Sequence, residues 1–208
     1  FDEKEGNRLS LEFAGDANIN GRVVPLKGFY AEPSMLRIFT LPMFKGDPAT
    51  ALTEPYSIVL TETSANKLFG EGDAFGKNIH FKDRDYKVTG ILKNVPFFSH
   101  LQFESLVSYS TIEPRIAKGQ DLLRWGNVYQ RNYVYVLLSE NASASEIQAR
   151  IDAICAEENR LDKDAQVHVT LLPLHDIMLG EDLENSIRPV MPRIVLWVIG
   201  GLALIVIL

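Results

Sequence analysis

The chain has 208 residues, of which 46% are hydrophobic and 23% are charged, a balance that is typical of a globular protein and excludes a disordered one. Its net charge of −6 and the lack of any run of Lys or Arg argue against duplex nucleic acid as a partner, so we expect no nucleic-acid binding. Cys155 is the only cysteine, which excludes a disulfide framework and a cysteine-rich zinc site.

The N-terminal part of the chain carries two strand patterns and one helix pattern. Residues 9–13 alternate apolar and polar side chains, as in a half-buried strand, and residues 23–30 form a second extended stretch. Pro33 suits the first turn of a helix, because apolar residues follow it at helical spacing up to Phe39.

The most regular pattern begins at Tyr56. A β-branched run predicts a strand that ends at Thr61, whose side chain can cap a following helix. Gly70 lies where the C-cap of that helix is expected. Residues 78–81 and 86–92 then predict two strands of a hairpin, joined by the turn sequence KDRD.

Three glycines near the end of this helix, Gly70, Gly72 and Gly76, precede Lys77 and resemble a phosphate-binding loop. In such a loop the glycines open a helix, because the helix N-terminus supplies the amide donors. Here they end a helix, only three residues separate Gly72 from Gly76, and Asn78 replaces the Ser or Thr of a P-loop. We therefore predict a positive φ at Gly70 or Gly72 and no nucleotide binding.

A second strand–helix–strand pattern covers residues 132–174. It combines an alternating strand in 132–139, a capping box of Ser143 and Glu146, and a returning strand from Val167 to Leu171. The helix carries the apolar stripe Ile147, Ile151, Ile154 and Cys155, where we interpret Cys155 as a small core residue. Across both patterns we expect these side chains to be buried: Val59, Leu68, Ile91, Val136, Ile151 and Val169.

Residues 194–208 are the most apolar stretch, fifteen residues without a charge. As a helix they would be ~22 Å long, against about 30 Å for a membrane core. The alternative is a buried C-terminal helix or strand, but a core helix usually keeps one polar face and this segment is apolar all round. We therefore predict the start of a transmembrane helix that contacts membrane lipid through residues 194–208.

The residue types that carry chemistry do not converge in the sequence. The histidines, His80, His100, His168 and His175, lack metal-binding spacing. We interpret Asp83 and Asp85 as turn residues and Glu157 and Glu158 as solvated surface, and no nucleophile elbow is present. We predict no catalytic, cofactor-binding or metal-binding residues.

Two long segments, EPYSIVLTETSANKLFGEGDAFGKNIHF and YKVTGILKNVPFFSHLQFESLVS, resemble the extracytoplasmic domain of MacB/FtsX-type ABC transporter permeases. EPSMLRIFTLPMFKGDP upstream and LLPLHDIML downstream extend the resemblance to residues 22–208. It implies an α+β fold with two lobes, one ferredoxin-like with a split βαβ unit and one smaller and variable, around residues 108–131. It also implies a core domain over residues 1–190 that lacks its N-terminal part, and a truncated membrane helix over 191–208.

The function that the resemblance implies is not enzymatic. The domain would lie on the periplasmic or extracellular side of the bacterial inner (cytoplasmic) membrane and couple ATP-driven motion of membrane helices to export or to mechanical signalling. Its partners would be an ABC ATPase subunit, a second permease copy in a dimer and other envelope proteins. Two alternatives stay open: a membrane-anchored extracytoplasmic binding protein without an ATPase, and an anchored hydrolase, which would need acid and base groups in one pocket.

Overall fold

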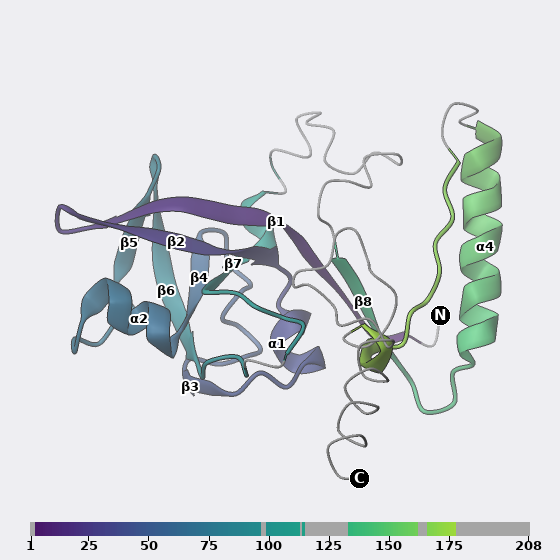
Figure 1. The fold of residues 1–208 in the computed structure, drawn as a ribbon, viewed down its shortest axis with the longest axis horizontal. Coiled ribbons are helices and arrows are strands. Elements are labelled where there is room, and N and C mark those ends of the chain that lie inside the picture. Colours follow the sequence, from purple (N-terminus) through teal and green to yellow (C-terminus); the bar gives the residue numbers. More distant parts are fainter. Residues whose placement is uncertain (1–2, 97–98, 113, 115–132, 162–165, 178–208) are drawn as a thin grey trace, which may run out of the picture. The chain divides into compact units, whose positions relative to one another are not determined.

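The computed structural model describes residues 3–96, 99–112, 114, 133–161 and 166–177 (Figure 1). The chain divides into two compact units, the first formed by Phe1–Asn94 with Phe103–His168 and the second by Val95–Gln102 with Val169–Leu208. The strands are β1 (Glu3–Ile19), β2 (Arg22–Ala31), β3 (Met43–Lys45), β4 (Ser57–Thr61), β5 (Asn78–Phe81), β6 (Arg84–Leu92), β7 (Ser105–Ser108) and β8 (Tyr133–Leu138). The helices are α1 (Ser34–Ile38), α2 (Glu62–Phe69), α4 (Ala144–Leu161) and the 3₁₀ turns η1 (Tyr109–Thr111) and η2 (Leu174–Asp176).

The strands of the first unit form a sheet that closes on itself. The hydrogen-bonded order is β2-β7-β4-β6-β5-β1, and β1 pairs again with β2, which completes a ring. The pairs β2–β7 and β4–β6 are parallel and the others are antiparallel. β8 extends the sheet from the first half of β1, and β3 pairs with the end of β6.

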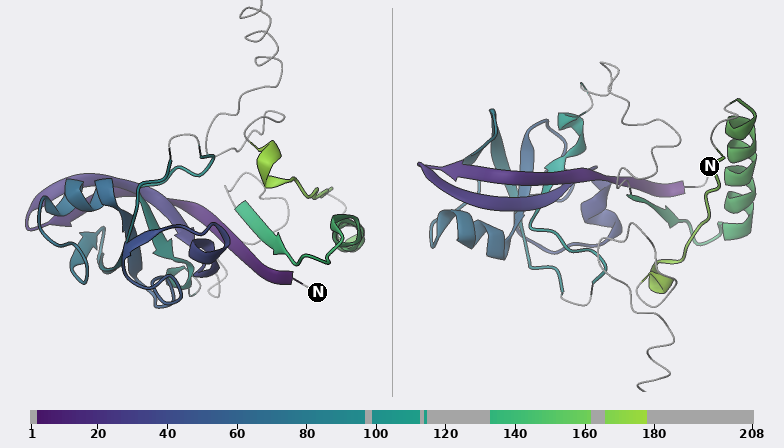
Figure 2. Two further views of the ribbon diagram at one scale, coloured as in Figure 1. Left: turned by 90° about the horizontal axis from the view of Figure 1, so that it is seen from below. Right: turned by 45° about the horizontal axis from the view of Figure 1, so that its top comes forward.

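The longest part of the ring is the β1–β2 hairpin, which Figure 2 shows as two curved strands running side by side. Asn20 and Gly21 form its two-residue turn, with φ values of 53° and 83°. Positive φ at both central residues defines a type I′ turn, for which Asn-Gly is the preferred sequence. The predicted hairpin of β5 and β6 is also present, and Lys82 takes a φ of 57° in its turn. The turn is shorter than predicted, because β6 begins at Arg84, so Asp85 pairs with His80 in the ladder and is not a turn residue.

The predicted strand–helix–hairpin unit is confirmed. β4 buries all five of its residues, as expected for a strand with neighbours on both sides. The Thr61 side chain accepts a hydrogen bond from the Ser64 amide and caps α2, whose C-cap is Gly70 with φ 65° and ψ −139°. The predicted positive φ is therefore found at Gly70, although ψ differs from that of a left-handed helical residue.

The core of the first unit lies between the strands of the ring and α2. Phe13 stacks on Phe81 with ring centroids 4.1 Å apart, and Tyr86 packs edge-on against both rings. Burial raises the pKa of the Tyr86 hydroxyl well above its ordinary value. Besides Tyr86, the buried members of this core are Phe13, Ala17, Val24, Leu26, Ile58, Leu60, Ala65, Leu68, Ala74, Ile79, Phe81, Val88, Ile91 and Val107.

Several predictions about the second pattern are wrong. β8 and α4 form, and the Ser143 hydroxyl accepts from the Glu146 amide at 3.4 Å, but residues 167–171 form no strand. Val59, Leu68, Ile91 and Cys155 are buried as predicted. Val136 and Ile151 are only partly buried, and Val169 is 40% exposed, since it does not lie in a strand that packs its side chain against the core.

The α+β class is confirmed, but the sheet differs in detail from the ferredoxin-like lobe that the resemblance implied, because β1 pairs with both β2 and β5 and closes the ring. The predicted membrane segment 194–208, the domain boundary at residue 190 and most of the segment 108–131 lie outside the described residues. Within the part of the chain that the structure describes, no helix combines the length and the apolar character that a membrane span requires.

One strained residue ends α1. The Thr40 amide donates to the Arg37 carbonyl and the Leu41 amide to the Leu36 carbonyl, both at 3.0 Å, which is the Schellman pattern. Thr40 occupies its left-handed position with φ 47°, where a β-branched side chain is strained.

We expect Thr40→Gly to raise the free energy of unfolding by about 1 kcal/mol in urea titrations, since the strain is lost. Thr40→Ala, which keeps the Cβ atom, should not reproduce this gain, and equal stability of Thr40→Gly and the wild type would contradict the explanation.

Candidate functional site

The glycine loop between α2 and β5 uses its own polar groups. The Gly76 amide donates to the Val88 carbonyl at 2.8 Å, and the Phe75 amide donates to the Asp73 carboxylate at 3.1 Å. The Asp73 carboxylate also accepts from Lys45 at 2.6 Å, which lowers its pKa. These amides are therefore engaged within the fold, and the loop follows a helix rather than opening one, as predicted.

The four histidines are not brought together. His80 lies opposite Asp85 in the β5–β6 hairpin, with His80 Nδ1 2.8 Å from Asp85 Oδ1, and both side chains are exposed. His100 is half-buried, and His168 and His175 are exposed. Among the described residues, no group of three or more His, Cys, Asp or Glu side chains is placed to hold a metal ion.

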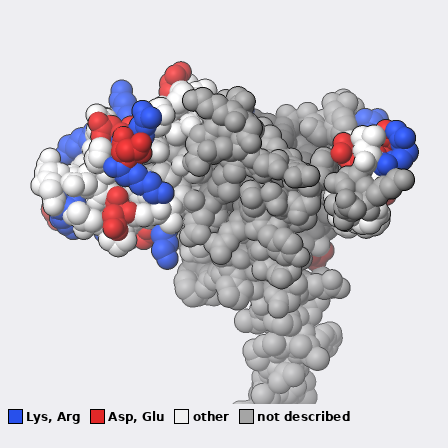
Figure 3. Space-filling view, turned by 90° about the horizontal axis from the view of Figure 1, so that it is seen from above, with Lys and Arg blue, Asp and Glu red and all other residues white. Residues whose placement is uncertain are grey.

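The surface charges are mixed. On the face shown in Figure 3, acidic and basic side chains lie interspersed over the described part of the first unit. Such a distribution creates no extended field of one sign on that part of the face.

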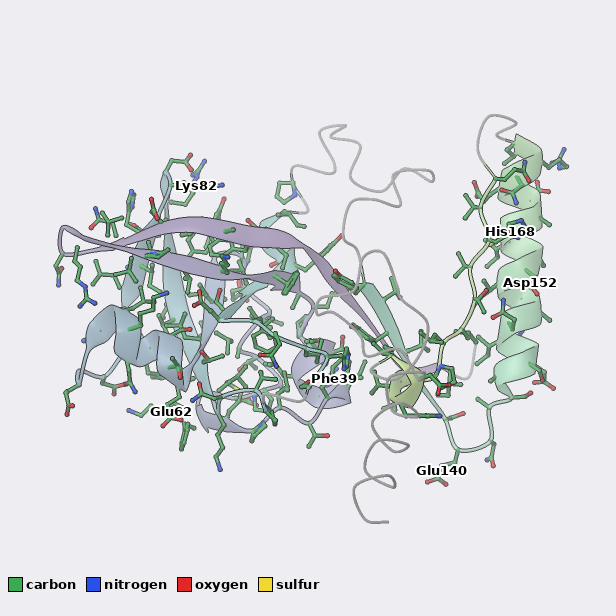
Figure 4. All side chains as sticks on the ribbon, in the orientation of Figure 1. Phe39, Glu62, Lys82, Glu140, Asp152 and His168 are labelled. Carbon is green, nitrogen blue, oxygen red and sulfur yellow. The ribbon has the colours of Figure 1, made fainter. Side chains whose placement is uncertain are left out.

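The feature that stands out in the first unit is where the chain leaves it and returns. The chain leaves after Asn94, just beyond the end of β6, and returns at Phe103, just before the start of β7. We call the bonds Asn94–Val95 and Gln102–Phe103 the crossing points. A residue beside each crossing point forms a hydrogen bond with α2, the helix whose first residue, Glu62, is labelled in Figure 4.

At the departing crossing point, the Thr63 amide donates to Asn94 Oδ1 at 3.0 Å. Thr63 lies in the first turn of α2, where backbone amides have no acceptor within the helix. Asn94 therefore supplies an acceptor that the helix needs, and its side chain is held at the N-terminal end of α2.

At the returning crossing point, Glu104 is bound through both its backbone and its side chain. Its amide donates to the Lys27 carbonyl at 3.2 Å and its carbonyl accepts from the Thr61 amide at 3.0 Å. Glu104 Oε2 accepts from the Lys27 amide at 2.8 Å, and Oε1 lies 3.3 Å from Lys67 Nζ on α2. The Lys67 ammonium also donates to the Pro25 carbonyl at 2.7 Å, so it joins α2 to both β2 and the returning chain.

The strand that follows the returning crossing point lies very close to β2. Gly28 pairs with Ser105 in the parallel β2–β7 ladder, and a Cβ atom at residue 28 would collide with the Ser105 carbonyl oxygen. The Ser105 hydroxyl donates to the Lys27 carbonyl at 3.1 Å. Residue 28 of β2 must therefore be a glycine, because it faces the first residue of β7.

Between the crossing points, the described residues Pro96 and Ser99–Gln102 form hydrogen bonds among themselves. The Gln102 amide group donates to the Pro96 carbonyl at 3.0 Å and to the Ser99 carbonyl at 3.2 Å. The Ser99 amide donates to the Pro96 carbonyl at 2.9 Å, and the Leu101 amide to the Ser99 hydroxyl at 3.2 Å. These bonds belong to the second unit alone.

Sequence patterns did not indicate Asn94, Glu104 or Lys67 as a group. The only available signal was the first turn of the predicted helix, where the Thr61 cap leaves further backbone amides that need acceptors from outside the helix. That signal says that partners exist, but their identity depends on a return of the chain that no local pattern specifies.

Comparison with known proteins gives a consistent result. Residues 8–154 match the family model described as MacB-like periplasmic core domain. No curated protein matches the chain.

Several solved structures have a similar fold, and three of them come from the following sources. A domain of a candidate permease from Porphyromonas gingivalis has a TM-score of 0.65 at 20% identity and covers 80% of this chain and 70% of its own. The periplasmic region of MacB from Actinobacillus actinomycetemcomitans has a TM-score of 0.56 at 14% identity, covering 77% and 69%. The extracellular domain of the noncanonic ABC-type transporter YknZ from Gram-positive bacteria has a TM-score of 0.54 at 16% identity, covering 79% of each chain.

His100 makes the stability of the chain depend on pH. Burial lowers the pKa of its imidazole below the ordinary value of 6.5, because the half-buried ring favours its neutral form. The unfolded chain therefore takes up this proton at a higher pH than the folded chain, so stability falls as the pH drops through 6.5.

We expect the Tm to fall less for His100→Gln than for the wild type between about pH 7.5 and about pH 5.5. His168→Gln, at an exposed position, serves as the control, and parallel curves for His100→Gln and the wild type would show that His100 does not contribute.

Proposed function

The chain belongs to the family of MacB-like periplasmic core domains, and on this premise we propose that it couples ATP-driven motion of membrane helices to export or to mechanical signalling in the cell envelope. Domains of this family are non-catalytic parts of ABC transporter permeases and lie on the extracytoplasmic side. The observation that carries the proposal is the family match over residues 8–154.

The architecture of the first unit suits mechanical coupling. A sheet that closes into a ring has no free edge within the ring, so each of its six strands is hydrogen-bonded on both sides. With a closely packed apolar core between the ring and α2, we expect such a body to move as one piece rather than to bend. A small displacement at one strand end is therefore carried across the whole unit.

In this proposal, residues 1–190 form the core domain and residues 191–208 begin a transmembrane helix in the bacterial inner membrane. The uncharged run 194–208 suits contact with lipid, where a helix satisfies its backbone polar groups internally. The partners are an ABC ATPase subunit, which supplies the energy, and a second copy of the permease. Hydrolysis on the cytoplasmic side then changes how two copies of this domain meet outside.

Spin-label distances between copies test the proposal. Single cysteines are placed at Val23 in the first unit and at Leu172 in the second, both well exposed, after the buried Cys155 has been changed to alanine. In the full-length permease reconstituted with its ATPase, we expect the distances between copies to differ between the nucleotide-free and ATP-trapped states. An ATPase variant that cannot bind nucleotide is the control. Identical distributions from both labels would leave only a passive membrane anchor, as in a binding protein without an ATPase.

A further inference from the structure

The structure points to α2 as the element through which motion of the second unit reaches the ring, with Asn94 and Glu104 as the positioning residues, and this inference rests on the proposed function. The second unit contains Val95–Gln102 together with Val169–Leu208, and so includes the run 194–208 that we assign to the membrane. We take the chain that joins the two units as the route by which motion that begins there reaches the ring.

Three covalent connections join the units, and they differ in how directly they reach the ring. The crossing points lie within a few residues of β6 and β7, which are both members of the ring. The third connection, His168–Val169, follows α4, which leads back to β8. Among the described strands, β8 pairs with the first half of β1 alone. The crossing points are therefore the short route, and the third connection is the long one.

The side-chain bonds decide whether the short route is stiff. A chain that merely continues from a strand end can swivel about its backbone dihedrals, which would absorb a small displacement. Asn94 and Glu104 prevent this swivel, because each is fastened to α2 as well as to its own strand end. The hydrogen bonds of Gln102 to the Pro96 and Ser99 carbonyls stiffen the described part of the intervening segment.

The helix then distributes the displacement. α2 packs against β2, β4 and β6, with Ala65 and Leu68 buried in the core of the ring. The two fastening points lie at different places along the helix, Thr63 in its first turn and Lys67 in its last turn. A displacement that reached only one of them would rotate the helix, whereas one that reaches both moves the helix together with the strands it covers.

Removal of the fastening bonds should uncouple the units without stopping the motion of the second one. The test uses the reconstituted permease with its ATPase and the labels at Val23 and Leu172, in the wild type and in the double variant Asn94→Ala/Glu104→Gln. In the wild type we expect both labels to shift on trapping of ATP. In the double variant we expect the shift at Leu172 to persist and the shift at Val23 to be lost, with nucleotide-free distances unchanged.

Two further variants complete the experiment, one as a control and one as an alternative to the double variant. Lys45→Met breaks the exposed ion pair with Asp73, which touches neither crossing point, and should keep both shifts. Lys67→Met removes the Glu104 bond from the helix side and serves if the double variant does not fold, with a diminished Val23 shift expected.

The outcomes separate the inference from the proposed function. An unchanged Val23 shift in the folded double variant would overturn the inference while leaving the coupling function in place. A wild type in which only Leu172 shifts would also overturn it, because motion would then stop short of the ring. If neither wild-type label shifts, the proposed function fails and the inference falls with it.

Discussion

The fold of the first unit depends on a narrow seam between β1 and β5. Only Ala17 and Asn18 of β1 pair with Phe81 and His80 of β5, so few hydrogen bonds close the ring at this point. Aromatic packing strengthens the seam, since the Phe13 ring stacks on the Phe81 ring. Gly15 makes room for this contact, because a Cβ atom there would lie 2.8 Å from the Phe81 ring. Apolar burial thus holds together what the backbone ladder alone would hold weakly.

Local signals accounted for the parts of the fold that are built from neighbouring residues. The strand–helix–hairpin unit from β4 to β6 was predictable, because its cap, its C-terminal glycine and its turn each have a local cause in the sequence. The Asn20–Gly21 signal was equally local and indicates the β1–β2 hairpin, although the strand patterns alone did not join the two strands. Ring closure was not predictable, since it needs β1 to find β5 across a long stretch of chain.

The failed strand at residues 167–171 shows the limit of alternation as a signal. Val167, Val169 and Leu171 repeat with the period of a strand, but a strand also needs a partner, and the period says nothing about one. Val167 instead exchanges two hydrogen bonds with the Asn159 side chain of α4, at 2.6 and 2.9 Å.

The candidate functional site could not be predicted from the sequence for a related reason. Asn94, Lys67 and Glu104 are common surface residues, and only the return of the chain beside α2 gives them a shared task.

The contact between Gly28 and Ser105 bears on how sequences in this family can diverge. At residue 28 of β2, the facing backbone of Ser105 leaves no volume for a side chain. A homologue that carries any other residue there must either displace the beginning of β7 or pair that strand in a shifted register. Position 28 is therefore a diagnostic marker. The residue at this position in an aligned sequence indicates whether β7 of that homologue pairs with β2 in the same register, and no structure of the homologue is needed for this.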